Sequence, residues 1–262
     1  MTEPLFDRRL RALRRDRAAR QGPALFLHQR AFDDCLDRLG DIQRRFTSAL
    51  LIGAPDPQWR WQLERLAPRV TILDPGPQFA AAAGGLAGDE DLGAFPQGSF
   101  DLCLAVGTLD TVSNLPAALS AIRRALLPDS LLIGALAGGD TLPHMRAAMR
   151  AADRVSGVAA PQVHPRIEAA ALAALLDRVG FAMPVVDVDR VHVAYPDFDR
   201  LVADLRAMAA TNILVSRARL PLSRAARDSA RSEFARLGDG QMTRELFEIL
   251  HFAAWSPGAV RG

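Results

Sequence analysis

Short runs of consecutive apolar residues alternate with segments of helical periodicity through the middle of the chain. The apolar runs predict buried strands at Ala49–Ile52, Val70–Leu73, Leu102–Val106 and Leu131–Ala137. The periodic segments predict helices near Gln58–Leu66, Leu115–Leu126 and Leu142–Val155. Strands that are apolar on both faces and separated by helices indicate a doubly wound, mostly parallel α/β sheet with helices on both sides.

Helical spacing of apolar residues also occurs at the two ends of the chain. Leu5–Leu13, followed by arginines up to Arg20, predicts a helix that Pro23 ends, and a second helix follows at Gln29–Leu39. After a linker-like stretch, the elements that we expect are a helix at Ile167–Val179, a strand pair around Pro184–Ala194, helices at Phe198–Ala210 and Leu222–Leu237, and a last strand at Gln241–Trp255.

Composition narrows the class of protein. At 262 residues, 49% hydrophobic and 24% charged, the chain has the make-up of a folded globular protein and not of a disordered or fibrous one. A net charge of +2 is too small to indicate nucleic-acid binding. The longest apolar run, Leu131–Ala137, is far below the ~20 residues of a membrane span, and the N-terminus has no apolar signal core, so we expect a cytoplasmic protein.

Side-chain inventory excludes several kinds of chemistry. Cys35 and Cys103 suggest neither a disulfide framework nor a zinc cluster, and the histidines have no metal-ligand spacing, so we expect no metal. The chain contains arginine but no lysine, so chemistry that needs a Schiff-base lysine is excluded. The N-terminal arginines allow two interpretations: a basic arm for anionic lipid or an acidic partner, or a solvated amphipathic helix beside the core.

Candidate chemistry lies where the predicted parallel strands end, because ligands bind at that edge of such sheets. Gly53 follows the first strand in a turn that resembles an ordinary strand-to-helix connection. Asp74 ends the second strand and could hold a ribose diol or cap the next helix. The triplet Asp89–Asp91 could bind an exocyclic amine or form an acidic surface loop, and Gly107 follows the next strand.

A Gly-Gly pair after the last run of the central block is the sharpest short motif. Gly138 and Gly139 permit a tight turn at the end of that strand. Either Asp140 or Thr141 could cap the following helix, which carries Arg146, and capping alone explains Asp140.

Together these segments resemble the class I S-adenosylmethionine-dependent methyltransferases. The branch they come closest to holds the mitochondrial complex I assembly factor 5 (arginine hydroxylase) family and the malonyl-acyl-carrier-protein methyltransferases. The segments that carry the resemblance are Leu5–Arg8, Arg17–Gln21, Ser99–Leu102, Asn114–Pro116, Leu126–Asp129, Ile133–Ala135, Gly138–Leu142, Val179–Phe181, Val193–Pro196, Asp204-Leu205, Met208 and Asn212.

The resemblance implies a seven-strand sheet and S-adenosylmethionine at the strand tips. It divides the chain into an N-terminal helical arm, residues 1–45, and a methyltransferase-like domain, residues 46–262, with a helical lid at about 197–238. It implies that Gly53 lies against the methionine moiety, Asp74 holds the ribose hydroxyls and Asp89 meets the adenine amine. Glu90 and Gly107 complete the candidate cofactor residues.

Five positions depart from the family pattern in the cofactor half. Leu51 replaces the acid two residues before the first glycine, and leucine cannot accept a hydrogen bond. Pro55 and Pro57 replace the second and third glycines, and proline has no N–H to donate. Asp110-Thr111 also replaces a His-Trp pair. These departures together predict weakened or lost cofactor binding.

Two functions follow from this combination. One is an S-adenosylmethionine-dependent enzyme acting on a protein client in respiratory complex I assembly. The other is a catalytically silent assembly factor on the same fold that binds its client, a complex I subunit, without using the cofactor. For both functions we expect at most peripheral membrane contact, through the arginine-rich helix. In either case Asp140, Arg146, Tyr195 and Asn212 are the candidate client residues. Tyr195, held extended before Pro196, is either a partner anchor or a core aromatic.

Overall fold

The computed structural model describes residues 4–93, 95–157 and 160–258. Its centre is a seven-stranded sheet in the order β3-β2-β1-β4-β5-β7-β6. Five strands run parallel: β1 (Ser48–Ile52), β2 (Arg69–Asp74), β3 (Leu86–Ala87), β4 (Phe100–Val106) and β5 (Leu126–Ala137). The last strand, β7 (Thr243–Trp255), is antiparallel to β5 and to β6 (Ala182–Tyr195). The predicted mostly parallel α/β sheet is confirmed. Residues 1–3, 94, 158–159 and 259–262 of the predicted domain ranges lie outside the described residues.

Helices cover both faces of the sheet because its central strands are apolar on both sides. Leu51 of β1 packs among residues of α2 (Phe26–Asp41) and α3 (Gln58–Glu64), where Phe32 stacks on Trp59 with ring centroids 4.2 Å apart. Leu50, the preceding residue, points to the opposite layer, formed by α5 (Leu115–Ala125) and α7 (Ala169–Val179). The core therefore consists of two apolar layers separated by the sheet.

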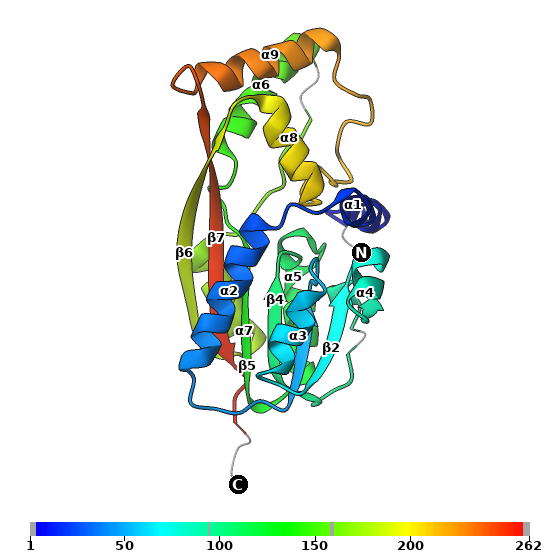
Figure 1. The fold of residues 1–262 in the computed structure, drawn as a ribbon, viewed down its shortest axis with the longest axis vertical. Helices are drawn as coiled ribbons and strands as arrows, with labels where there is room; N and C mark the ends of the chain where they lie inside the picture. The colour runs from blue at the N-terminus through cyan, green and yellow to red at the C-terminus, as the bar shows by residue number, and fades with distance from the viewer. Residues whose placement is uncertain (1–3, 94, 158–159, 259–262) are drawn as a thin grey trace.

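A second helical group extends the molecule beyond the parallel strands. Strands β6 and β7 continue past the others and reach α6 (Pro143–Ser156), α8 (Phe198–Ala207) and α9 (Arg224–Arg236), as Figure 1 shows. Helix α1 (Arg8–Gln21) lies between this group and the sheet, next to α4 (Pro77–Ala82) and α8. It therefore crosses the edge at which the parallel strands end.

Several predicted elements differ from the observed ones: β5 begins at Leu126 and not at Leu131, α2 begins at Phe26 and not at Gln29, and β3 was not predicted. Two further differences have a local backbone cause. The strand pair expected around Pro184–Ala194 is a single edge strand, β6, in which an irregularity between Ala182 and Val185 takes up Met183, with φ of +51°. An edge strand tolerates proline, so Pro184 does not divide it. The helix expected to reach Ala210 ends at Ala207, because Ala209 has φ of +59°, outside the helical region.

Within the described ranges, no helix combines the length and the hydropathy that crossing a membrane requires.

Candidate functional site

Three parallel strands bring candidate residues to one edge of the sheet. Gly53 and Gly107 follow β1 and β4, and Asp74 ends β2. The two glycines have φ of +81° and +69°. A Cβ on Gly53 would lie 2.3 Å from the carbonyl oxygen of Val106, and one on Gly107 would lie 2.4 Å from the His28 ring. Both positions require glycine, and the space above Gly107 already holds His28.

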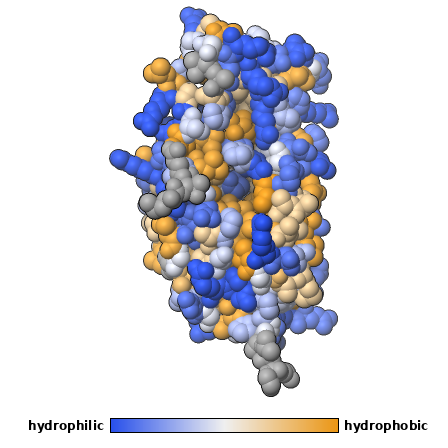
Figure 2. All heavy atoms as spheres, turned by 180° about the vertical axis from the view of Figure 1, so that it is seen from behind, coloured by the Kyte–Doolittle hydropathy of each residue, from blue (hydrophilic) through white to orange (hydrophobic). Residues whose placement is uncertain are grey.

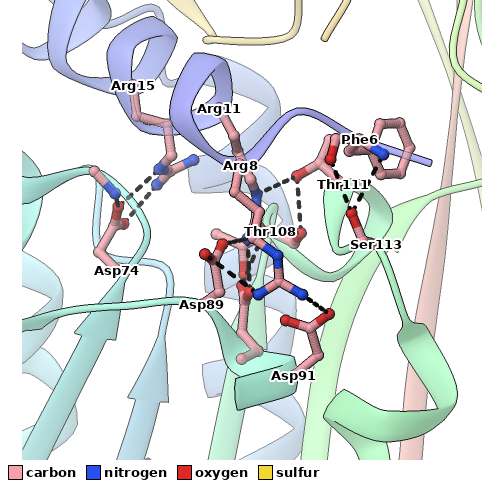
Figure 3. A network of polar contacts seen from close by, with 12 residues as sticks. Phe6, Arg8, Arg11, Arg15, Asp74, Asp89, Asp91, Thr108, Thr111 and Ser113 are labelled. Atoms are coloured by element: carbon pink, nitrogen blue, oxygen red, sulfur yellow. Dashed lines mark hydrogen bonds and ion pairs between the residues drawn. The ribbon is translucent and has the colours of Figure 1, made fainter. Parts of the chain in front are cut away.

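The carboxylate of Asp74 is fully buried and its oxygens are saturated by protein donors. The backbone amides of Ala54 and Gly76 donate to it at 2.9 and 2.7 Å. Arg15 of α1 adds two hydrogen bonds, from Nε at 2.7 Å and from Nη2 at 2.5 Å (Figure 3). Each carboxylate oxygen thus accepts two hydrogen bonds, in the fork geometry that favours arginine.

A second arginine of α1 holds the acidic turn after β3. The Arg11 guanidinium donates to Glu90 at 2.7 and 3.0 Å and to Asp89 at 2.8 Å. It also donates to the carbonyl oxygen of Thr108 at 2.6 Å. Burial alone would lower the pKa of Arg11, but the charges of Glu90 and Asp89 raise it above its ordinary value. Burial would likewise raise the pKa of Glu90, which the Arg11 charge holds below its usual range.

A third arginine extends the same face of α1. Arg8 donates to Asp91 at 2.7 Å and lies 3.5 Å from Asp89 (Figure 3). Positions 8, 11 and 15 share one face of a helix, so one rigid element carries all three guanidinium groups. The expectation of a solvated helix is therefore wrong for Arg11 and Arg15, which are 3% and 6% exposed.

The segment that follows β4 contains another buried ion pair. Arg166, in the irregular chain before α7, donates to Asp110 at 2.6 Å. Burial would raise the pKa of Asp110, but the Arg166 charge lowers it below its ordinary value. Thr111 accepts a hydrogen bond from Nε of Arg11 at 3.1 Å. The Asp110-Thr111 substitution noted in the sequence thus contributes to holding α1 and the chain before α7 over the sheet.

Beneath these ion pairs lies a cavity of about 100 Å³. Its walls are mostly apolar, and residues that contribute to them are Leu27, His28, Val106, Met208, Ile213 and Phe247. Burial lowers the pKa of His28 to about 4, with a further contribution from the positive charge of Arg15. Nδ1 of His28 is buried and has no hydrogen-bond partner among the described residues.

The four candidate client residues have different environments. Tyr195 is 2% exposed and packs near Phe247, and burial followed by the Asp204 charge raises its pKa. It is therefore a core aromatic and offers no exposed anchor. Asn212 bonds the carbonyl of Pro161 and the amide of Leu214, which makes it part of a turn.

The other two candidate client residues lie near the start of α6. Arg146 donates to the carbonyl oxygen of Gly139 at 3.0 Å. Asp140 is exposed and its carboxylate is 3.6 Å from Arg190.

The start of α6 is capped differently from the expectation. Neither Asp140 nor Thr141 caps this helix; Leu142 occupies the cap position without a side-chain hydrogen bond. Instead, the buried carboxylate of Glu245, on β7, accepts from the amides of His144 at 3.2 Å and Met145 at 2.7 Å. Thr141 bonds both backbone groups of Glu248. The capping prediction is wrong because a neighbouring strand supplies the acceptor.

Sequence reasoning missed the residues that complete this site, namely Arg8, Arg11, Arg15, Glu245, His28 and Arg166. The sequence feature that could have indicated them is the helical spacing of Arg8, Arg11 and Arg15. This spacing fits a helix face that contacts carboxylates as well as it fits a face exposed to solvent. The acidic partners themselves were among the candidates.

Comparisons with known proteins agree with the observed fold. A methyltransferase-domain family model matches residues 53–134, the part of the chain from the β1 turn into β5. Among solved structures, the YcgJ protein of Bacillus subtilis superposes with a TM-score of 0.59 at 9% identity, covering 87% of this chain and 99% of that protein. Sheet order, strand-end site and superposition together define a Rossmann-like class I methyltransferase fold.

Sequence relatives identify the family within this class. The mouse mitochondrial arginine-hydroxylase NDUFAF5 is 30% identical over 280 residues, which cover 96% of this chain and 77% of the mouse protein. A malonyl-[acyl-carrier protein] O-methyltransferase from Laribacter hongkongensis is 29% identical over 69% of this chain and 59% of its own length. The chain belongs to the NDUFAF5 family.

Proposed function

We propose that this chain is a methyltransferase-fold assembly factor for respiratory complex I, which binds a protein client and does not use S-adenosylmethionine. The observation that carries the proposal is the pairing of Arg15 with Asp74 and of Arg11 with Glu90 and Asp89. The resemblance assigns these acids to the ribose and adenine of the cofactor. Here the protein's own helix holds them.

The residues at the strand ends do not fit the cofactor. All four hydrogen bonds to Asp74 come from protein groups, so its carboxylate has no free acceptor for a ribose diol. Leu51 lies in the apolar core and cannot hold an ammonium group. Pro55 and Pro57 supply no N–H donors, and His28 lies against Gly107. A ligand would have to separate buried ion pairs, which costs about 3–5 kcal/mol for each charge left alone.

A second candidate is the S-adenosylmethionine-dependent enzyme acting on a protein in the same assembly process. It is favoured by the retention of Gly53, Asp74 and Asp89 at the strand tips next to an apolar cavity. For the cofactor to bind, α1 would have to move away from the strand ends, so that Arg11 and Arg15 release their acidic partners. The two candidates therefore differ in one measurable property, the affinity of the folded protein for the cofactor.

Thermal unfolding in the presence of S-adenosylhomocysteine separates the two candidates. A ligand at a hundred times its Kd stabilises the folded state by about 2.7 kcal/mol, which raises Tm by several degrees. We expect millimolar S-adenosylhomocysteine or S-adenosylmethionine to leave Tm unchanged. A rise of several degrees with either compound would overturn the silent-factor proposal in favour of the enzyme.

Removal of the gene tests the role in assembly. We expect the deletion to lower the amount of assembled complex I on native gels, and expression of the wild-type chain to restore it. Normal complex I in the deletion strain would contradict the proposed role, whatever the outcome with the cofactor.

A further inference from the structure

A groove of about 720 Å³ runs between α1, α8 and the segment after α8. It lies on the far side of α1 from the cofactor-type acids: positions 14 and 17 line it, whereas 8, 11 and 15 face Asp74 and the acidic turn. Among the described residues, the lining holds one acid, Asp199, and seven arginines, namely Arg14, Arg17, Arg166, Arg206, Arg217, Arg219 and Arg227. We call this feature the arginine groove.

Most of this positive charge has no counter-ion within the described residues. Arg166 pairs with Asp110 and Arg217 with Asp7, while Asp199 is itself paired with Arg231 outside the lining. No ion pair in the described part of the chain involves the other five lining arginines. The groove therefore concentrates uncompensated positive charge in a concave site, where fields are strongest.

The positive charge in the groove changes the environment of Arg14. Burial, followed by the positive charges of Arg17, Arg206 and Arg217, lowers the pKa of Arg14. Its Nε is buried and has no hydrogen-bond partner among the described residues. A buried donor without an acceptor is costly, and an anion in the groove would supply the missing partner.

Part of the groove lining is apolar, and we call this part the floor. It consists of the partly buried Met145, Val202 and Leu222 together with the buried Leu142, Met149, Phe198 and Leu205. Methionine adapts to differently shaped apolar partners. The groove thus combines cationic walls with an apolar base, which selects a ligand that is acidic and apolar in the same short segment.

We propose that the arginine groove binds an acidic peptide segment of the client that also carries large apolar side chains. This inference rests on the proposed client-binding function and specifies the chemistry of the contact. Arginine forks recognise the carboxylates, and the apolar floor receives a leucine- or phenylalanine-sized side chain. Because Leu142, Arg166, Leu205 and Ala210 line both the groove and the cavity, the bound segment lies beside the strand ends.

A peptide accounts for these features better than a membrane surface. Binding to a bilayer interface requires a continuous apolar face beside the basic residues. Here the large exposed apolar residues are spread over the surface, and of these only Leu220 lines the groove. Figure 2 shows hydrophobic residues interspersed with hydrophilic ones over the rear face.

The proposal is tested with labelled peptides and the full-length chain. We expect a short fluorescein-labelled peptide of glutamates interspersed with leucines to bind, and the same peptide with lysine for glutamate not to bind. The double variant Arg206→Gln/Arg219→Gln should weaken binding about tenfold, since each exposed charge pair contributes up to about a fivefold factor in affinity. Arg65→Gln/Arg69→Gln removes the same charge from exposed positions outside the groove and should leave affinity unchanged.

Three results would overturn the proposal. They are equal loss of affinity in the two double variants, no binding of the acidic peptide, and preferential binding to phosphatidylglycerol vesicles that the groove variant alone abolishes. None of these readouts depends on S-adenosylhomocysteine. A failed peptide experiment is therefore distinct from a failure of the silent-factor proposal, which the thermal measurement decides.

Discussion

Arginines on one helix have different environments according to their position. Arg11 and Arg15 are buried against carboxylates, Arg14 lines the groove with a lone Nε, and Arg9 is exposed. Lysine could not replace the buried pair, because its ammonium group presents no planar fork and is more strongly hydrated. At positions 11 and 15, arginine is therefore the residue that the bonding geometry requires.

Removal of the Arg15 side chain should destabilise the protein strongly. In Arg15→Ala, Asp74 remains buried with its charge no longer compensated, which typically costs about 3 kcal/mol or more in the free energy of unfolding. Urea titration measures this loss. Arg9→Ala is the matched control on the same helix, and it should change stability by about 0.5 kcal/mol or less. Equal stability of the two variants would contradict the Arg15–Asp74 assignment.

Stability should also fall in mildly acidic solution. Burial lowers the pKa of His28 and of His164 from 6.5 to about 4 in the folded protein. Between those values the unfolded chain binds protons that the folded protein does not, so stability is complete above pH 6.5 and is lost as the pH falls towards 4. Urea midpoints measured across this range should decline, and His28→Gln should flatten the decline. An unchanged slope in that variant would mean that His28 is not buried as described.

At the residue scale, the sequence identified the acids but not their partners. Gly53 and Asp74 could be placed because each follows a strand-length apolar run, and parallel strands end at one edge. The Asp89–Asp91 triplet follows only a small apolar stretch, in which no strand was predicted. Arg15 and Asp74 are 59 positions apart in the chain. Nothing local indicates that pairing, since the same helical spacing suits a solvated face.

At the scale of elements, the start of α6 depends on a strand that follows much later in the chain. Glu245 of β7 accepts hydrogen bonds from two amides of the first turn of α6, and also from the Leu246 amide. Helix N-termini leave such amides without intrahelical partners. The contact therefore connects the long strand to the helical group above the sheet.

Loss of this acceptor should be measurable. Glu245→Ala leaves the two partly buried amides without their acceptor and should lower the free energy of unfolding by about 2 kcal/mol. Glu245→Gln keeps one carbonyl acceptor, so its loss in a urea titration should be smaller. If the alanine variant were as stable as the glutamine variant, the hydrogen bonds from α6 to Glu245 would not contribute to the free energy of unfolding.

Elements were predictable where their own pattern determines them. The four central strands and α2, α5, α6 and α7 follow from apolar runs and helical periodicity alone. The single strand β6 and the early end of α8 could not be predicted from these patterns. Pro184 is accommodated only because β6 is an edge strand. Helix α8 ends just before Ala209, which takes a left-handed backbone conformation that the local sequence does not predict.

At the scale of the whole molecule, α1 belongs to two sites at once. One face closes the strand ends of the methyltransferase fold through Arg8, Arg11 and Arg15, and another face lines the arginine groove. A ligand in the groove and a ligand at the strand ends would therefore act on the same helix. Under the proposed function, the client binds in the groove while α1 occupies the strand ends, where the fold family holds its cofactor.

Hydrogen exchange of α1 tests this central claim most directly. Buried ion pairs on Arg11 and Arg15 hold the helix in the protein alone, so its amides should exchange slowly, as core amides do. Addition of S-adenosylhomocysteine should not slow them further. Rapid exchange of α1 in the protein alone, with protection appearing only when S-adenosylhomocysteine is added, would contradict the account and show that the cofactor completes the site.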